Sequence, residues 1–164
     1  MTNSSVDKIT REQNVLTVSP EATAHAAARV MRRHEIGCLV VTDGDGIVQG
    51  ILTERDIVKS VVAKAMNPEE TLVKQIMTFE VVYCGLDTSI SKAQQIMAEH
   101  GIRHLPIIEE GAPVGMISSR DILAHQLSAV KAIARKQRKV LQELEKQHPG
   151  ITQLEVDNRG RVVI

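Results

Sequence analysis

The sequence predicts a mixed α/β (α+β) fold in which two copies of a β-α-β-β-α unit pack as a pseudo-twofold module, followed by a long helix and a β-hairpin. The first observation behind this prediction is a phrase that occurs twice, as GILTERDI at 50–57 and as GMISSRDI at 115–122. The second is that earlier segments match as well, 15–23 with 81–89 and 31–41 with 97–107. The third is the stretch 119–148, which contains neither proline nor glycine.

Each copy is expected to begin with a short β-branched strand, at 15–18 or 81–84, and to continue into a helix, at about 21–34 or 89–100. The helix is predicted because apolar residues recur at helical spacing on one face. These residues are Ala24, Ala27, Val30 and Met31 in the first copy and Ile90, Ala93, Ile96 and Met97 in the second. His34 and His100 end the helices, where a C-terminal cap favoured by the helix dipole is expected, with a pH or metal role as the alternative.

A second strand follows in each copy, at 38–41 or 105–108, and leads into a turn that reads DGDG or EEGAP. Glycine, aspartate and proline mark these turns because they suit unusual backbone angles. A third strand then ends at a hydroxyl residue, Thr53 or Ser118, and the second helix of the copy begins there.

The alignment of the copies predicts the domain boundaries. One unit of this size is small for a core of its own, so we expect the two units to pack together. The first repeat spans 6–65, a linker containing NPEE spans 66–71, the second repeat spans 72–127, and a C-terminal extension spans 128–164.

The C-terminal extension is predicted to be a helix followed by a hairpin. Its helix carries an apolar stripe near heptad spacing, interrupted by Gln137. The stripe consists of Leu127, Val130, Ala134, Leu141 and Leu144. Pro149-Gly150 ends the helix, and ITQLEV and RVVI predict a β-hairpin over 151–164. The stripe is expected to cover the edge of the module or to pair with the same helix of a second subunit, and we expect a homodimer.

Composition disfavours several classes of function. Aromatic residues make up 1% of the chain, so stacking of bases on several exposed aromatic rings is not expected. The formal net charge is zero, which gives no general reason to bind nucleic acid or an anionic membrane. No apolar run is long enough to span a bilayer, and the first residues are too polar for a secretion signal, so we expect a cytoplasmic protein. Cys38 and Cys84 lack metal-site spacing and are expected to be buried and reduced.

The repeats resemble a known family. Residues 6–127, roughly, resemble a pair of cystathionine β-synthase (CBS) domains. The features that carry this resemblance are the tandem β-α-β-β-α order of elements, the GIRHLPI stretch at 101–107 and the two G-h-x-[ST]-x-x-D phrases. The resemblance implies a disc with two clefts related by a pseudo-twofold axis, which commonly bind adenine nucleotides or S-adenosylmethionine. It also implies a regulatory role without catalysis, exerted on an effector protein that the sequence does not name.

The duplicated phrase suits a nucleotide on physical grounds as well. A helix that begins at the hydroxyl residue offers unpaired backbone N–H groups and a partial positive charge to a phosphate. Arg55 and Arg120 lie in the first helical turn and add forked donors. Asp56 and Asp121 can accept both hydroxyls of a ribose. The alternative is that each aspartate only completes an N-cap, which stabilises a helix by about 1 kcal/mol.

By similarity, each cleft draws its walls from both copies. The first cleft is expected to use Gly37, Cys38, Thr53, Arg55, Asp56, Thr78 and Tyr83. The second cleft is expected to use Thr10, Ile36, Arg103, His104, Ser118, Arg120 and Asp121, although Thr10 lies in a segment that matches the family loosely. Because Arg103 and His104 stand where the first copy has Gly37 and Cys38, we expect the second cleft to bind polyphosphates more strongly.

The leading functional hypothesis is a non-catalytic regulatory module that senses AMP, ADP, ATP or S-adenosylmethionine. No catalytic constellation is visible, and we expect neither a required cofactor nor a metal site. One alternative is a ligand-independent interaction scaffold that uses the C-terminal helix and hairpin. Another is nucleic-acid binding through the basic segment 131–139, which the neutral total charge disfavours.

Overall fold

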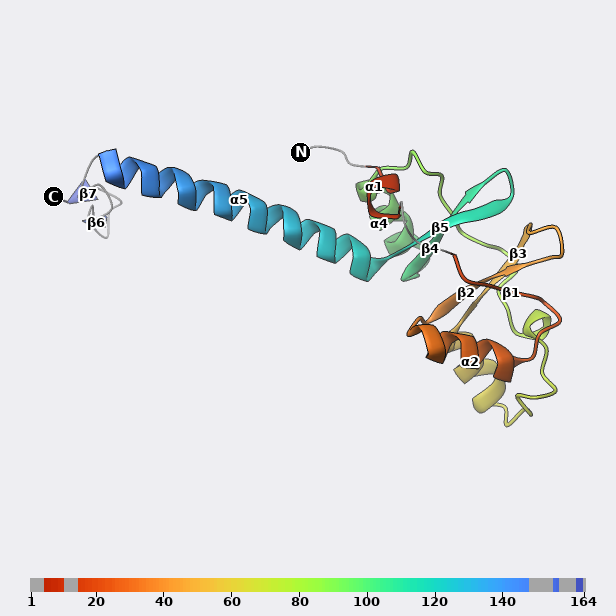
Figure 1. Ribbon diagram of the computed structural model, residues 1–164. Coiled ribbons are helices and arrows are strands. Elements are labelled where there is room, and N and C mark those ends of the chain that lie inside the picture. Colours follow the sequence, from red (N-terminus) through yellow and green to blue (C-terminus); the bar gives the residue numbers. More distant parts are fainter. Residues whose placement is uncertain (1–4, 11–14, 148–154, 157–161, 164) are drawn as a thin grey trace. The chain divides into compact units, whose positions relative to one another are not determined.

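The computed structural model describes residues 5–10, 15–147, 155–156 and 162–163 (Figure 1). The chain divides into two compact units, Met1–Ile122 and Leu123–Ile164. The first unit holds both β-α-β-β-α copies up to the start of the long helix, and the second holds the rest of that helix and two short strands. Within the described residues, no helix combines the length and the apolarity needed to cross a membrane.

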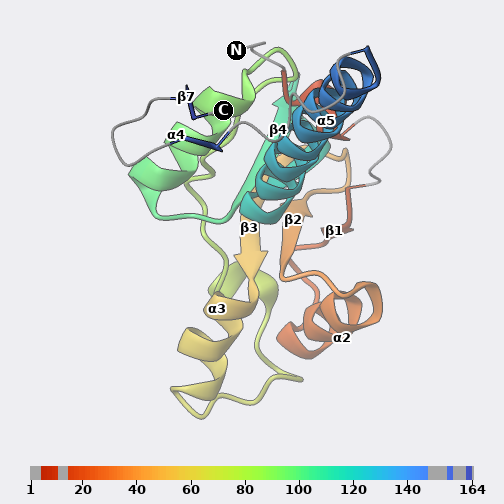
Figure 2. The same ribbon diagram turned by 90° about the vertical axis from the view of Figure 1, so that its left-hand side faces the viewer.

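The first copy forms a three-stranded sheet in the order β1-β2-β3, with α2 packed on one face (Figure 1). Its elements are β1 (Thr17–Val18), α2 (Ala24–His34), β2 (Cys38–Thr42), β3 (Val48–Thr53), α3 (Glu54–Asp56) and the π-helix η1 (Ile57–Val62). β1 runs parallel and β3 antiparallel to β2, and every residue of this central strand is buried. The predicted order of elements is confirmed, and Figure 2 shows β3 leading directly into α3.

The second copy repeats this order. Its elements are α4 (Ile90–His100), β4 (His104–Glu109), β5 (Ala112–Ser118) and the first residues of α5 (Ser119–Gln147). β4 and β5 pair antiparallel. The strand predicted at 81–84 is reduced to one parallel bridge between Cys84 and Ile107.

Pro106 explains why this strand is so short. In the first copy, the amide of Val40 donates to the carbonyl of Leu16 across the parallel pair, at 3.3 Å. Pro106 occupies the position of Val40 in the second copy and has no N–H to donate to Val82. The pairing therefore ends at Cys84, whose amide donates to the carbonyl of Pro106 at 3.1 Å.

Helices α2 and α4 begin and end in the same way. Each begins after a hydroxyl residue, Thr23 or Ser89, which accepts the backbone N–H three residues later at 3.1 Å. Each ends at a residue in the left-handed conformation, Glu35 (φ 54°) or Gly101 (φ 62°). Glycine adopts this conformation without strain and glutamate does not, so the first copy carries a local cost that the second copy avoids. Gly101 also separates His100 from the next strand.

Two hydrophobic cores lie in the first unit, and each is completed by the segment that opens the other copy. The first core, around Leu39 and Leu52, includes residues of and after the 3-10 helix η2 (Val73–Gln75), namely Val73, Ile76 and Met77. The second core, around Leu105 and Ile117, includes Val6, which precedes the short helix α1 (Asp7–Thr10). Isolated β-bridges join the opening segment of each copy to the other copy. They are Thr23↔Leu72, Ile51↔Thr78 and Ser5↔Ser89. Packing therefore crosses the linker predicted at 66–71.

The C-terminal helix α5 spans 29 residues, which confirms the predicted long helix. It ends at Gln147, shortly before Pro149-Gly150. Strands β6 (Glu155–Val156) and β7 (Val162–Val163) pair antiparallel, as the predicted hairpin requires. The remaining residues of that prediction lie outside the described residues.

Candidate functional site

Both duplicated phrases form the same junction between a strand and a helix. β3 ends at Thr53 and β5 ends at Ser118. In each copy, the residue after this hydroxyl residue donates its backbone N–H to a backbone carbonyl. That carbonyl belongs to the residue that precedes the neighbouring strand. These bonds run from Glu54 to Gly37 and from Ser119 to Arg103, both at 3.0 Å. The start of each helix is therefore tied to the adjacent strand.

The two aspartates fold back onto the hydroxyl residues that precede them. Oδ2 of Asp121 accepts hydrogen bonds from Ser118 N (2.8 Å) and Ser118 Oγ (2.6 Å), and Asp121 N donates to Ser118 Oγ (3.2 Å). Asp56 and Thr53 make the same three bonds at 2.9, 2.6 and 3.3 Å. The capping interpretation is thus confirmed for both phrases. Within the described residues these bonds use only Oδ2, so Oδ1 is the oxygen available to a ligand.

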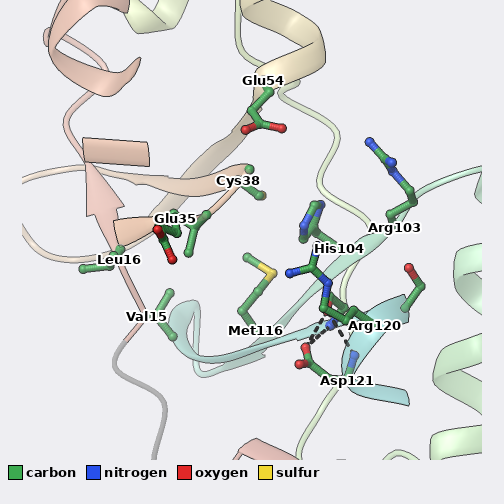
Figure 3. Close-up of a pocket in the computed structure, with 14 residues that line it drawn as sticks. Val15, Leu16, Glu35, Cys38, Glu54, Arg103, His104, Met116, Arg120 and Asp121 are labelled. Carbon is green, nitrogen blue, oxygen red and sulfur yellow. Dashed lines mark hydrogen bonds between the residues drawn. The ribbon is translucent and has the colours of Figure 1, made fainter. Parts of the chain in front are cut away.

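A cavity of about 520 Å³ lies beside Asp121 and is the second cleft of the sequence analysis (Figure 3). Six of the predicted residues line it, namely Ile36, Arg103, His104, Ser118, Arg120 and Asp121. Figure 3 shows Val15, Leu16 and Glu35 of the first copy on one side and Arg103, His104 and Arg120 of the second copy on the other. The cavity has the size of a small-ligand site.

A cavity of about 400 Å³ lies beside Asp56 and corresponds to the first cleft. Five of the predicted residues line it, namely Gly37, Thr53, Arg55, Asp56 and Thr78. The other copy contributes the end of α4 and the start of β4, from His100 to His104. Each phrase therefore has a hollow beside its aspartate, and both copies supply the walls of each hollow.

Three predicted residues lie elsewhere. Cys38 lines the second cleft instead of the first. Tyr83 is 57% exposed and lines a separate hollow with Phe79, near the turns that join the strands. Thr10 is buried in α1, where its hydroxyl donates to the carbonyl of Val6 at 3.0 Å. The segment with the loose match to the repeat pattern forms the helix α1 at this point.

Several lining residues were not predicted, and among them the repeat indicates Ile102, which is the counterpart of the predicted Ile36. Applying the offset between the copies to one cleft finds residues of the other. The pairs are Leu16 with Val82, Ile36 with Ile102, Ile51 with Met116, and Glu54 with Ser119. Glu35 and Glu80 have no acidic counterpart and only the structure places them at the clefts.

One wall is common to both clefts. Gly37, Glu54, Arg103 and His104 line the first cleft and the second alike. The carboxylate of Glu54 covers Gly37 so closely that a Cβ at position 37 would lie 2.8 Å from Glu54 Oε2. The prediction that the second cleft binds polyphosphates more strongly than the first took Arg103 and His104 to belong to the second cleft alone. This basis is wrong, because both residues line both clefts.

The charges at the clefts are mixed. Two arginines line each cleft, Arg55 and Arg103 at the first and Arg103 and Arg120 at the second. Three carboxylates oppose them in each case. They are Glu54, Asp56 and Glu80 at the first cleft and Glu35, Glu54 and Asp121 at the second. Neither cleft therefore offers the excess positive charge that a polyphosphate favours.

Two further groups at the second cleft stay neutral near neutral pH. Burial lowers the pKa of His104, and the neighbouring Arg103 lowers it further, against the opposite effect of Glu54 and Asp121. Burial raises the pKa of the Cys38 thiol to about 12, and Asp56 raises it as well. A neutral imidazole can both donate and accept a hydrogen bond, whereas this thiol is not a reactive nucleophile.

Comparison with known proteins identifies the family. The CBS domain family matches this chain twice, at residues 6–63 and 73–128. The chain belongs to the CBS-domain family. Its CBS pair comprises the two copies whose junctions form the clefts, and the two matches leave most of α5 outside the pair.

Relatives of the CBS pair agree in sequence and fold. The CBS domain-containing protein YhcV of Bacillus subtilis is 36% identical over 121 residues, which cover 74% of this chain and 85% of YhcV. A CBS-domain containing protein of Agrobacterium tumefaciens superposes with a TM-score of 0.67 at 36% identity, over 74% of this chain and 94% of that one. The CBS domain pair of protein MJ0100, solved in complex with 5′-methylthioadenosine and S-adenosyl-L-methionine, has a TM-score of 0.67 at 24% identity, over 74% and 98% of the two chains.

Proposed function

We propose that the CBS pair is a non-catalytic regulatory module that binds an adenosine-type ligand in its two clefts. The observation that carries this proposal is the cavity beside each duplicated strand–helix junction, with an aspartate and an arginine of the same phrase in its wall. The ligands bound by the structurally similar CBS pair of MJ0100 support the chemical class. The free, buried Cys38 and Cys84 fit a reducing compartment such as the cytoplasm.

Each part of the ligand has a matching set of side chains. Oδ1 of Asp56 or Asp121 would accept the ribose hydroxyls, while Oδ2 holds the cap. The adenine would lie against apolar residues, which are Val15, Leu16, Ile36 and Met116 at the second cleft and Ile51, Val82 and Ile102 at the first. Arg120 or Arg55 would contact the group on the 5′ carbon of the ribose. No aromatic ring is needed for this arrangement.

The mixed charge of the clefts ranks the candidate ligands. Each additional phosphate brings more negative charge towards Glu54 and the two other carboxylates of the same cleft. S-adenosylmethionine carries a sulfonium cation, 5′-methylthioadenosine is neutral, and AMP has a single phosphate. We therefore place these three ahead of ADP and ATP at both clefts.

Isothermal titration of ligand-free protein with AMP, ADP, ATP, S-adenosylmethionine and 5′-methylthioadenosine tests the proposal. We expect saturable heat with at least one of the first-ranked ligands and weaker binding of ATP. Absence of binding by all five ligands would refute the adenosine proposal. Tighter binding of ATP than of AMP would leave the ligand class intact but would refute the argument from charge.

A ligand-independent interaction scaffold is the second candidate function. The observation that favours it is the row of exposed apolar side chains on α5, which includes Leu127, Val130 and Leu141. In this case the homodimer and the contact with an effector protein would depend on the C-terminal extension alone. Asp56→Ala and Asp121→Ala would then leave oligomeric state and partner binding unchanged, whereas a ligand-dependent regulator would lose its response to the ligand.

A further inference from the structure

Helix α5 carries a long apolar face that is exposed. Seven large apolar side chains between residues 123 and 144 are between 39% and 65% exposed. They are Leu123, Leu127, Val130, Ile133, Val140, Leu141 and Leu144. An amphipathic helix in water normally buries such a face against a partner, because the apolar stripe supplies most of the stability of the helix.

The exposed face follows a heptad register. Leu127, Ala134 and Leu141 occupy position a, and Leu123, Val130, Gln137 and Leu144 occupy position d. Ile133 and Val140 widen the face at position g. This register holds from Leu123 to Leu144, just over three heptads, which correspond to about 33 Å of helix at 1.5 Å per residue. Such a sustained a/d pattern is typical of a helix that pairs with another helix of the same kind.

The charges favour an identical helix in parallel orientation. Position e holds Ala124, Lys131, Arg138 and Glu145. In a parallel pair, position g lies beside position e five residues later in the partner, so the methylene stems of Arg138 and Glu145 cover Ile133 and Val140. In an antiparallel pair of the same segments, e lies beside e, and at the centre Lys131 of one chain faces Arg138 of the other. A parallel pair also aligns Gln137 with the same residue of the second copy, so that the two amides can bond to each other.

An anionic lipid surface is the main competing occupant, because α5 carries basic residues beside its apolar face. Lys131, Arg135, Lys136, Arg138 and Lys139 lie in this helix. Interfacial helices commonly insert tryptophan or phenylalanine, and α5 contains no aromatic residue. The heptad register, which a flat lipid surface does not require, also favours a second helix.

We propose that residues 123–147 of α5 form a parallel, in-register coiled coil with the same segment of a second copy of this chain. The capping box of Ser118 and Asp121 begins the same helix, so the second cleft lies at the start of the pairing element. The proposal does not depend on a ligand, and its tests use the full-length chain without one.

Sedimentation equilibrium of paired variants tests the surface. Leu127→Asp/Leu141→Asp places charge at two a positions, and Ser128→Asp/Gln142→Asp places the same charge at the adjacent b positions as a matched control. We expect a wild-type dimer, a dimer in the control, and a dissociation constant raised about tenfold or more in the a-position variant. Circular dichroism must show folded protein in both variants. A monomeric wild type, or a dimer that the a-position variant leaves unchanged, would overturn the proposal.

Disulfide trapping tests the orientation. Leu123→Cys and Leu144→Cys lie at opposite ends of the helix, and the native Cys38 and Cys84 are buried. With a copper–phenanthroline oxidant, a parallel pair cross-links either variant with itself. Cross-linking only in a mixture of the two variants would assign an antiparallel pair and overturn the parallel arrangement.

Flotation with vesicles of phosphatidylserine and phosphatidylcholine tests the competing occupant. We expect the wild-type dimer to remain unbound at physiological salt. Flotation of a protein that is monomeric in solution, lost in Leu127→Asp/Leu141→Asp but not in the control, would assign the face to lipid and overturn the proposal.

Discussion

Replacing Asp121 with asparagine separates the two roles of its carboxylate. Asparagine can keep the oxygen that accepts hydrogen bonds from Ser118 N and Ser118 Oγ, at 2.8 and 2.6 Å in the wild type. It replaces the other oxygen by an amide group that donates and cannot accept from a ribose hydroxyl. Asp121→Ala removes both functions. The pair of variants therefore distinguishes a cap that also binds ligand from a cap alone.

The expected magnitudes follow from these bonds. Loss of the capping box in Asp121→Ala costs about 1–2 kcal/mol of unfolding free energy, which lowers the melting temperature by about 2–8 °C. Asp121→Asn loses only the charge near the helix N-terminus, about 0.3–1 kcal/mol. One hydrogen bond between the carboxylate and a ribose hydroxyl is worth about 1.5–3 kcal/mol, so its loss should weaken binding of an adenosine ligand at the second cleft at least about tenfold to a hundredfold in both variants.

Thermal unfolding without ligand and isothermal titration with the best ligand of the five measure both effects. Asp45→Asn, at an exposed position in the DGDG turn, is the control for loss of a carboxylate elsewhere. The result that refutes the reasoning is an Asp121→Asn variant that binds like the wild type at the second cleft. Asp121 would then act only as a helix cap.

Three further predictions concern residues that line the clefts. Glu35→Gly should stabilise the protein by about 1 kcal/mol in thermal unfolding, because Glu35 has φ 54° at a position where the second copy has glycine. Gly101→Glu should destabilise the protein, and a change of stability in the same direction for both variants would contradict this explanation. Glu54→Gln should raise the affinity for ATP more than that for 5′-methylthioadenosine in titrations, and an unchanged ratio would show that Glu54 does not set the charge preference. Because the pKa of His104 is lowered from 6.5, its contribution to stability is present above that pH and is lost as the pH falls below it; denaturant unfolding of wild type and His104→Gln between pH 7.5 and about 5 should show a smaller loss in the variant.

Local patterns were sufficient for much of the fold. The apolar spacing that begins at Ala24 and at Ile90 predicted α2 and α4, and the absence of proline and glycine predicted α5. The strand at 81–84 was predicted to be longer than it is. The pattern of β-branched residues does not show whether the partner strand has a backbone N–H to donate at each position. Pro106 lies more than twenty residues away, and its effect on this strand appears only when the two segments are paired.

The candidate clefts were predictable in part for the same reason. Thr53, Asp56, Ser118 and Asp121 belong to short phrases whose function is local, so their capping geometry follows from spacing. Tyr83 was expected at the first cleft from the resemblance to the family, yet it lies in another hollow. Which hollow a side chain lines depends on the strands and turns that pack against its segment.

The amino-acid sequence by itself determined the duplication, the order of the elements and the two capped junctions, because each depends on contacts between residues that are close along the chain. Only the tertiary structure decided that the opening segment of each copy completes the core of the other, and that Glu54, Arg103 and His104 stand between the two clefts. These features depend on side chains that are distant in sequence, and their positions result from the joint packing of both copies.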